Sequence, residues 1–375
     1  MNTVTRSRDQ DACPGALQVH QAADGALVRV RLPGGMISAA QLLVLAHSAA
    51  EVGSGALELT SRGSVQLRGV SDPASVADAL AGAGLLPSVS HERARNIVAS
   101  PLSGRRGGVT DVRPWVAELD AAIQGAPALA ELPGRFWFSL DDGRGDVSGL
   151  RADAGVQALG DGAVALLLAG LDTGVRLSRA EAVPALTRIA ERFLQIRGKC
   201  WRITELEDTE ALLTGFARTA PASRVAPPTA VAPVGWFTQD DARVALGAAV
   251  PLGVLSARTA EFLAAIEAPL VITPWRSVLV CDLAEGVADT ALRVLAPQGL
   301  VFDENSPWLS VSACTGSPGC ERSAADVRAD ATAAVESGTV TARRHYVGCE
   351  RACGSPVDGQ VLVATPDGYR QRNRP

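Results

Sequence analysis

The alternation of apolar and polar positions predicts a strand, a turn, a helix and a strand pair within the first 90 residues. Residues 27–32 alternate with the period of a strand, and residues 37–50 carry apolar side chains at helical spacing after a Pro-Gly-Gly turn. Residues 57–60 and 65–68 form two short strand patterns around Arg62-Gly63, which suits a tight turn. Together these elements predict one strand–helix–strand unit.

The same order of elements recurs 213 residues later. The strand pattern at 57–60 corresponds to residues 270–273, so that Thr60 falls on Thr273, and a helix is expected over 257–266. An internal repeat of a whole supersecondary unit indicates two halves related by pseudo-twofold symmetry. A chance match between two generic strand–helix–strand units is the alternative.

The repeat divides the chain into segments. A larger α/β region separates the two units, with strands expected at 136–140 and 163–168 and a helix at 181–196. The predicted divisions are a first repeat unit at 14–87, an α/β domain at 91–219, a Pro-rich linker at 220–233, a second repeat unit at 234–303 and a last segment at 304–375.

Composition limits the class of protein. Of the 375 residues, 47% are hydrophobic, which allows a sizeable core and excludes a disordered chain. The net charge of −5 argues against a nucleic-acid binder, which needs a basic surface. No apolar run approaches the roughly 20 residues that cross a bilayer, and the first residues lack the apolar core of a secretory signal. We therefore expect a cytoplasmic protein without nucleic-acid or membrane partners.

Four of the seven cysteines form two pairs near the end of the chain. The pairs have the spacings C-x5-C and C-x3-C, with 28 residues between them, at Cys314, Cys320, Cys349 and Cys353. Four thiolates from two loops can hold a [4Fe–4S] cluster or a structural zinc ion, although C-x5-C is unusual for zinc. A helix expected over 321–336 would place Cys320 at its N-terminus, where the helix dipole favours a thiolate. Four unrelated buried thiols are the other alternative. Cys200 and Cys281 are expected in the core, and the role of Cys13 stays open.

Three motifs together resemble the sirohaem-dependent sulfite and nitrite reductases. The cysteine pattern is similar to their cluster signature, Thr60–Arg68 to their T-x-R-x-x-x-Q segment, and Arg95–Leu102 to their R-N-V-x-x-C-P segment, with Ser100 where a cysteine is common. The resemblance implies an α+β fold, in which a pseudo-twofold repeat of ferredoxin-like half-domains is joined to two α/β sulfite-reductase-type domains. It also implies a [4Fe–4S] cluster as cofactor, held by Cys314, Cys320, Cys349 and Cys353.

Within this superfamily the chain is most similar to the precorrin-3B synthase branch. The similarity lies in Cys13–Leu17, Leu32–Gly35, Thr60–Gly69 and Thr273–Arg276. It implies an oxygen-dependent monooxygenase that hydroxylates precorrin-3A and closes a lactone, giving precorrin-3B in aerobic cobalamin biosynthesis. It further implies a mononuclear non-haem iron, whose ligands stay unidentified because the four histidines lack ligand spacing. An external electron donor, a reductase or a ferredoxin, is expected because no G-x-G-x-x-G motif follows a strand.

A tetrapyrrole is a flat macrocycle fringed with carboxylates, and guanidinium groups pair with carboxylates bidentately. Of the 35 basic residues only Lys199 is a lysine. The substrate-binding residues expected from the resemblance are Arg62, Gln66, Arg68, Arg95, Asn96 and Arg105. The expected catalytic residues are Arg62, Arg95 and Arg135. For each arginine, a solvated surface position in an arginine-rich protein is the alternative.

The reductases hold sulfite or nitrite with two lysines of a P-R-K-F-K run. The matching run here is Leu132–Phe138, in which Arg135 stands for the first lysine and Trp137 for the second. Loss of a cation beside a small anion costs about 1.5–3 kcal/mol of binding, which argues against sulfite or nitrite as substrate. A sirohaem-[4Fe–4S] sulfite or nitrite reductase is the alternative function, in which Cys353 would also bridge to the sirohaem iron. A four-cysteine zinc interaction protein is the non-enzymatic alternative.

Overall fold

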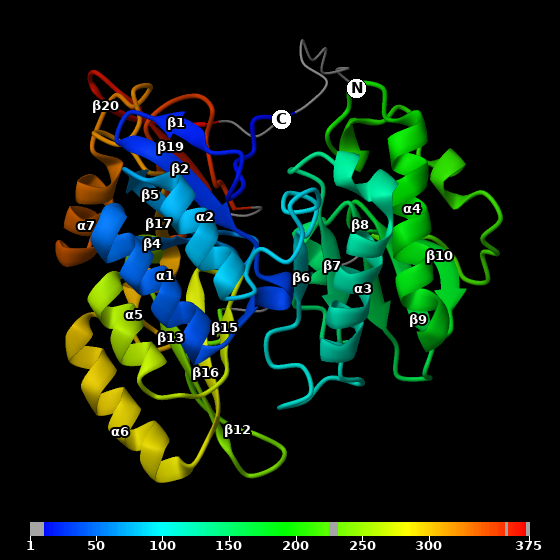
Figure 1. Cartoon of the computed structure of the whole chain (residues 1–375), viewed down its shortest axis with the longest axis horizontal. Helices are drawn as coiled ribbons and strands as arrows, with labels where there is room; N and C mark the ends of the chain where they lie inside the picture. Colours follow the sequence, from blue (N-terminus) through cyan, green and yellow to red (C-terminus); the bar gives the residue numbers. More distant parts are fainter. Residues whose placement is uncertain (1–10, 225–231, 357–358, 373–375) are drawn as a thin grey trace.

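The computed structural model describes residues 11–224, 232–356 and 359–372. Four β-sheets and seven α-helices lie within these ranges (Figure 1). Two five-stranded sheets contain the repeat units, a six-stranded sheet is formed between them along the chain, and a four-stranded sheet follows the second unit. None of the described helices is long and apolar enough to cross a membrane.

Each five-stranded sheet takes four strands from one repeat unit and one strand from the other. The first sheet has the order β1 (His20–Ala22), β2 (Gly25–Val30), β5 (Val65–Val70), β4 (Ala56–Leu59) and β14 (Val254–Ser256). The second has the order β12 (Gly235–Thr238), β13 (Val244–Ala249), β16 (Ser277–Leu283), β15 (Leu270–Ile272) and β3 (Met36–Ile37). The units therefore exchange β3 and β14. The sequence pattern did not reveal this exchange, because strands of two or three residues carry no periodicity.

Helices cover the two sheets and close one common core. α1 (Ala39–Val52) and α5 (Ala257–Ala264) pack side by side (Figure 1), and the other helices of the repeat are α2 (Pro73–Gly82) and α6 (Glu285–Leu295). The hydroxyl of Ser38 accepts a hydrogen bond from a backbone N–H in the first turn of α1, and Ser256 caps α5 in the same way. Leu42, Leu45 and Leu263 are fully buried in the shared core. The predicted repeat is confirmed by this equal order of capped helices and strands.

Thr60 and Thr273 close the same turn in the two units. Thr60 Oγ1 accepts hydrogen bonds from the backbone N–H groups two and four residues later, at 3.3 and 3.1 Å. Thr273 Oγ1 accepts the equivalent bonds at 3.3 and 3.3 Å. The third residue after each threonine has a left-handed backbone, with φ of 62° at Gly63 and 59° at Arg276. The expected equivalence of Thr60 and Thr273 is therefore confirmed down to the turn geometry.

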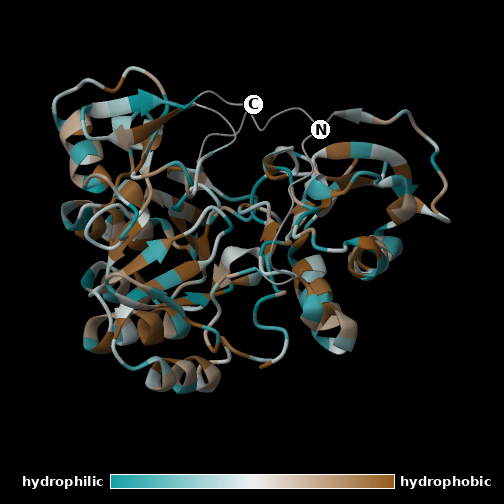
Figure 2. Ribbon diagram, turned by 90° about the horizontal axis from the view of Figure 1, so that it is seen from above, coloured by the Kyte–Doolittle hydropathy of each residue, from teal (hydrophilic) through white to brown (hydrophobic). Residues whose placement is uncertain are grey.

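The region between the units is a mixed sheet packed against two helices. Its strand order is β11 (Ser223–Arg224), β10 (Leu171–Leu177), β9 (Val164–Leu168), β8 (Ala154–Ala158), β7 (Phe138–Asp141) and β6 (Ile97–Ala99). The helices are α3 (Arg113–Gly125) and α4 (Ala182–Ile196). Hydrophobic and hydrophilic positions interleave along these elements (Figure 2), and the buried positions form a core of their own. The strands expected at 136–140 and 163–168 and the helix expected at 181–196 are found within two residues.

The last segment pairs short parallel strands beside one helix. Its sheet has the order β17 (Val311–Ala313), β18 (Arg344–Val347), β19 (Gln360–Thr365) and β20 (Gly368–Gln371), with α7 (Val327–Glu336) packed on it. The prediction that a helix begins directly after Cys320 is wrong. Asp326 caps α7 by accepting from the N–H groups of Arg328 and Ala329 at 3.2 and 3.1 Å. Residues 321–325 instead form turns that bond to the neighbouring loops.

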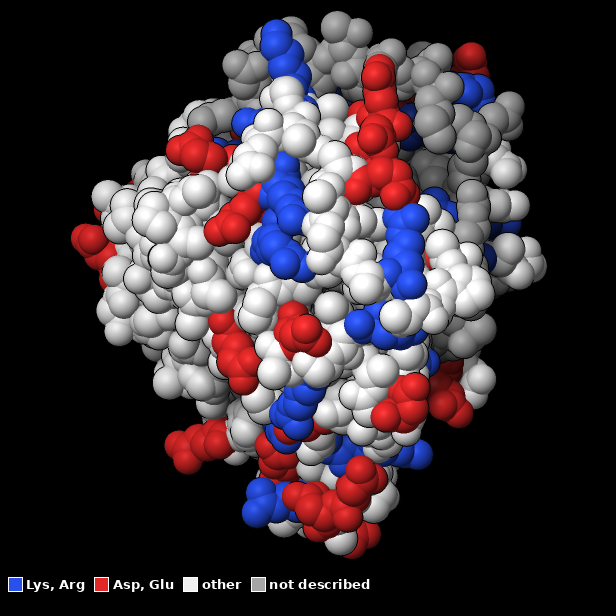
Figure 3. Space-filling view, turned by 90° about the vertical axis from the view of Figure 1, so that its right-hand side faces the viewer, with Lys and Arg blue, Asp and Glu red and all other residues white. Residues whose placement is uncertain are grey.

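The surface over α4 carries charges of both signs. Figure 3 shows this side of the molecule, where basic and acidic side chains are interspersed among uncharged atoms and neither sign forms a continuous field. The described residues of this face therefore offer no basic patch for an anionic ligand. A site for such a ligand is better formed by buried guanidinium groups that lie close together.

Candidate functional site

The two cysteine loops meet at one edge of the last sheet. Cys314 directly follows β17, and Cys349 lies two residues after β18. Since β17 and β18 are parallel, their carboxyl ends lie at the same edge and bring both loops together. Gly348 donates its N–H to Cys314 Sγ at 3.3 Å. A Cβ at Gly348 would lie 1.8 Å from Ser323 Oγ, so only glycine allows this approach of the loops.

The four thiols lie within electrostatic reach of one another. Burial raises the pKa of Cys314, and the thiols of Cys320 and Cys349 raise it further against the N–H groups of Gly348 and Gly316. Burial also raises the pKa of Cys353, with added repulsion from the other three thiols. Such a set becomes stable as thiolates only when a cation or cluster neutralises it.

The spacing of the thiols is wider than a zinc site requires. Tetrahedral zinc with Zn–S bonds of about 2.3 Å holds its sulfurs about 3.8 Å apart. Among the described residues, the one group of three or more His, Cys, Asp or Glu ligand atoms within 4.8 Å of one another is formed by aspartates. No three of the four cysteine sulfurs therefore lie within 4.8 Å of one another.

Three of the predicted substrate-binding arginines already have carboxylate partners. Arg95 binds Asp120 with two hydrogen bonds of 2.6 and 2.9 Å, and Arg105 binds the carboxylate of Asp282 at 2.9 and 3.0 Å. Arg68 binds Asp24 at 2.8 and 2.8 Å and donates to the carbonyl of Gly319 at 2.7 Å. Their guanidinium forks are occupied within the chain, so the structure does not support the assignment of these three to substrate carboxylates.

The two predicted amides position other groups. Gln66 accepts hydrogen bonds from the guanidinium of Arg29, one of them at 3.0 Å. Asn96 Oδ1 accepts from Arg31 Nε at 3.1 Å. The Asn96 amide also donates to the carbonyls of Arg93, Gly134 and Phe136 at 2.9, 3.1 and 3.0 Å. Gln66 and Asn96 thus hold two arginines that the sequence did not single out and fix the loop around Gly134.

Arg62 lies half-buried beside the loop around Gly134. Its Nη1 donates to the carbonyl of Gly134 at 3.2 Å, and its guanidinium lies 5.6 Å from the centre of the Trp137 ring. No carboxylate within the described part of the chain is hydrogen bonded to it. Burial and the neighbouring Arg202 lower the pKa of Arg62 to about 9, although Asp153, which is hydrogen bonded to Arg202, acts in the opposite direction.

Trp137 provides an unsatisfied donor beside Arg62. The side chain is 5% exposed, and its Nε1 is buried without a hydrogen-bond acceptor in the described structure. Trp275, from the turn of the second repeat unit, packs against the apolar cluster that contains Trp137. The turns of both repeat units therefore reach one apolar cluster, with Arg62 at its edge. A buried N–H without an acceptor costs about 1–3 kcal/mol, so a ligand with acceptor atoms fits this place.

Cys13 lies next to this junction. Its sulfur accepts from Arg29 Nη1 at 2.8 Å and from Arg31 Nη2 at 3.4 Å, and burial lowers the pKa of Arg31 to about 10. A Cβ at Gly134 would lie 2.8 Å from Cys13 Cβ. Cys13 also borders a cavity of about 340 Å³, which is lined by Asp11, Ala12, Cys13, Leu17, Gln18, Val19 and His20. Arg29 and Arg31 are thus further cations near Arg62 that lie outside the motifs.

Arg135 lies on the outside of the same loop. Its side chain is exposed, with the guanidinium 5.8 Å from the Trp201 ring centre, whereas its backbone N–H donates to Asp11 at 2.7 Å. Arg135 and Trp137 therefore occupy opposite environments, one at the surface and one buried. The predicted catalytic role of Arg135 has no geometric support.

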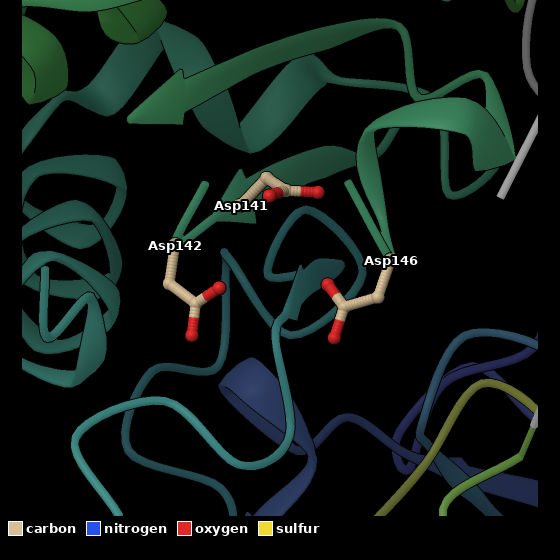
Figure 4. Close-up of side chains that lie close together, drawn as sticks. All are labelled: Asp141, Asp142 and Asp146. Carbon is tan, nitrogen blue, oxygen red and sulfur yellow. The ribbon is translucent and has the colours of Figure 1, made fainter. Parts of the chain in front are cut away.

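The aspartate group noted above lies at the end of β7 (Figure 4). Asp141 accepts four backbone N–H bonds from the following loop, at 2.9–3.1 Å. Asp142 binds Arg144 at 2.6 and 2.8 Å, and Asp146 accepts from the Ser100 hydroxyl at 2.6 Å. Burial, reinforced by Asp141, raises the pKa of Asp146 to about 7. With these partners the group fixes the loop after β7.

Two further polar residues lie beside the cysteine loops and were not singled out from the sequence. His345 is fully buried, and burial lowers its pKa to about 4, so that its imidazole is neutral. Burial and the nearby Arg343 lower the pKa of Arg276. The available signal in the sequence was a histidine that lies four residues before Cys349.

Comparisons with known proteins agree with this geometry. The model of the nitrite/sulfite reductase ferredoxin-like half domain matches residues 20–81. A precorrin-3B synthase from Sinorhizobium sp is 28% identical over 388 residues, covering 98% of this chain and 83% of that protein. The structure of the Mycobacterium tuberculosis NirA protein matches with a TM-score of 0.74 at 19% identity, over 92% of this chain and 73% of that one. The expected α+β fold is confirmed, and similarity to a named enzyme over nearly the whole length identifies this chain as an enzyme.

Proposed function

We propose that this enzyme, which resembles precorrin-3B synthase within the sulfite and nitrite reductase superfamily, is an oxygen-dependent monooxygenase that converts precorrin-3A to precorrin-3B. The reaction hydroxylates the macrocycle and closes a lactone with a ring carboxylate. The observation that carries the proposal is the buried Nε1 donor of Trp137, which has no acceptor among the described residues and lies beside the guanidinium of Arg62. Arg62 lacks a carboxylate partner and Trp137 Nε1 lacks an acceptor in the described structure.

A macrocycle with peripheral carboxylates satisfies both donors. Arg62 would pair with a ring carboxylate, a charged hydrogen bond that contributes about 1.5–3 kcal/mol. The cluster around Trp137 and Trp275 offers an apolar surface to the ring face. Arg29 and Arg31, held by Gln66 and Asn96, supply further positive charge along the same edge. These residues bind and orient the substrate and exclude water from its face.

The cysteine loops fit a [4Fe–4S] cluster. Cys314, Cys320, Cys349 and Cys353 would be its ligands. The assignment is supported by the electrostatic repulsion among their thiols, which helps to raise the pKa of Cys314 and Cys353. When bound, the cluster supplies single electrons, which an external reductase or ferredoxin would deliver. Resemblance extends the proposal to a mononuclear non-haem iron. We assign it no ligands, because the aspartates of Figure 4 already have their oxygens engaged by N–H groups, Arg144 and Ser100.

The alternative function is a sirohaem-dependent sulfite or nitrite reductase. Fold similarity to NirA is compatible with it. It is disfavoured because an exposed Arg135 and a buried Trp137 stand where two anion-binding lysines would be needed. Dioxygen is neutral and does not require paired cations in that place.

One experiment separates these functions. The anaerobically purified protein is analysed for iron, acid-labile sulfide and solvent-extractable sirohaem, and is then supplied with precorrin-3A, oxygen and a strong electron donor. The proposal expects iron and sulfide without sirohaem, oxygen consumption that depends on precorrin-3A, and a product heavier by one oxygen atom. Extractable sirohaem with six-electron reduction of sulfite or nitrite would reverse the choice. Zinc without sulfide would instead support a structural zinc protein.

A further inference from the structure

The backbone of the Cys353–Gly354 segment is held from two directions. His345, on β18, has its Nε2 2.9 Å from the carbonyl oxygen of Cys353. Arg276, in the turn of the second repeat unit, donates from Nη2 to the carbonyl of Gly354 at 3.1 Å. Two consecutive carbonyls next to the last cysteine are thus bound by side chains that lie eight and 78 residues away in the sequence.

The imidazole of His345 is fixed on both sides. It is fully buried, and its Nδ1 lies 2.8 Å from the hydroxyl of Ser312 on β17. Because a carbonyl only accepts, Nε2 carries the hydrogen, so that Nδ1 accepts from the Ser312 hydroxyl. The ring therefore connects β17, β18 and the Cys353 loop in a single orientation.

Arg276 occupies a backbone position that favours glycine. Its φ of 59° lies in the left-handed region, and the equivalent residue of the first unit is Gly63 with a φ of 62°. A side chain there strains the backbone, whereas glycine does not. Within the part of the chain that the structure describes, the Arg276 side chain donates one hydrogen bond, to the Gly354 carbonyl. The backbone strain at Arg276 is therefore accompanied by one specific side-chain contact, which lies beside the cysteine loops.

Arg276 also brings a positive charge that no carboxylate neutralises directly. Within the described residues no acidic side chain lies within 4.0 Å of its guanidinium, and the nearby Glu58 is paired with Arg328 at 2.5 Å. A positive charge beside a redox group favours the reduced, more negative state of that group. Trp275, the residue before Arg276, packs against the cluster around Trp137, so the same turn touches the proposed substrate site.

We propose that Arg276 and His345 are positioning residues for Cys353, and that the charge of Arg276 raises the reduction potential of the iron–sulfur group that Cys353 would hold. This inference rests on the proposed role of Cys353 as a ligand. The Thr273–Arg276 turn would then have a role in electron transfer, in addition to its similarity to the family motif. Trp275 of this turn packs at the proposed tetrapyrrole site, and Arg276, the next residue, contacts the Cys353–Gly354 segment.

The first test uses Arg276→Gly, which places in the second unit the residue that the first unit has. The variant should lower the ratio of reduced to oxidised protein at the parent's midpoint potential at least tenfold, or 59 mV for one electron. Its iron and sulfide content should stay at the parent's level. Arg276→Lys keeps the positive charge and should therefore have a reduction potential close to that of the parent. The matched control is Ala242→Gly, since Ala242 is exposed and has a φ of 65° far from the cysteines in sequence; it relieves the same kind of strain without removing a charge.

The second test uses the protein without its iron–sulfur group. Hydrogen exchange at the amides of Ala352 and Ser355 should become at least tenfold faster in Arg276→Gly and in Ser312→Ala, with exchange in α4 unchanged. The thermal midpoint of Arg276→Gly should not fall below that of the parent, because the lost hydrogen bond is offset by relief of strain.

The outcomes are separable. A parent protein that never binds iron and sulfide defeats the proposed function, whereas the exchange measurement still decides whether the two side chains hold the loop. A parent with a full complement of iron and sulfide, and an Arg276→Gly variant with an unchanged potential, overturns the potential-setting role. Unchanged exchange in both variants overturns the positioning role.

Discussion

The guanidinium of Arg62 lies 5.6 Å from the centre of the Trp137 ring, and the two side chains come from different parts of the fold. Arg62 belongs to the turn between β4 and β5, whereas Trp137 directly precedes β7 of the six-stranded sheet. Among the described residues, Trp137 Nε1 has no acceptor and Arg62 has no hydrogen-bonded carboxylate. Their contact places the proposed substrate site between the first repeat unit and the middle region.

Arg62→Ala should weaken precorrin-3A binding about tenfold or more, because 1.4 kcal/mol corresponds to a factor of ten and a charged hydrogen bond contributes about 1.5–3 kcal/mol. Fluorescence or absorbance titration of the anaerobic protein measures this affinity. Arg243→Ala, at a side chain that is 61% exposed, should bind as the parent does. Equal affinity of Arg62→Ala and the parent would remove Arg62 from the site.

Arg95→Met should destabilise the protein rather than weaken binding. Its removal leaves Asp120 without the bidentate partner that it has in a mostly buried position, which costs about 3–5 kcal/mol. Urea unfolding measures the loss, and the folded fraction should keep the parent's affinity for precorrin-3A. Arg293→Ala removes an exposed pair with Asp289 and should cost less than about 1 kcal/mol. A stable Arg95→Met protein with poor affinity would return Arg95 to the substrate site.

Asp146→Asn should remove a pH dependence of stability. Burial and Asp141 raise the pKa of Asp146 from 3.8 to about 7, so the folded state keeps a proton that the unfolded state releases above pH 4. This contribution is fully present below pH 4 and is lost as the pH rises to about 7. Asparagine stays neutral and can still accept from Ser100. Between pH 4 and pH 8, the free energy of unfolding of the variant should therefore rise by about 2–4 kcal/mol relative to that of the parent. Urea unfolding at both pH values measures this, and a constant difference would contradict the raised pKa.

Serine in place of any of Cys314, Cys320, Cys349 or Cys353 should abolish the EPR signal of the reduced cluster, because each thiolate would occupy one iron. The controls are Cys200→Ser and Cys281→Ser. Cys281 is fully buried, and burial raises its pKa to about 11, as suits an inert core thiol. The controls should keep the signal. A full signal in Cys314→Ser would make the ligand assignment wrong.

The sequence by itself determined the features that depend on local spacing. Apolar periodicity placed α4 and the strands of the middle sheet, and the match of Thr60 with Thr273 identified the repeat. The spacing of the cysteines predicted that the two loops form one site. These features follow from the period of a helix, the period of a strand and the geometry of a tight turn, each of which involves residues close in the chain.

Only the tertiary structure decided which cations are available. Arg95, Arg105 and Arg68 find carboxylates that are 25, 177 and 44 residues away in the sequence, and no local pattern identifies such partners. The exchange of β3 and β14 also joins segments about 200 residues apart. Among the described residues, neither Arg62 nor Arg276 has a hydrogen-bonded carboxylate. That absence is a property of packing in three dimensions, because a side chain's counter-charge is set by what folds against it rather than by what precedes it in the chain.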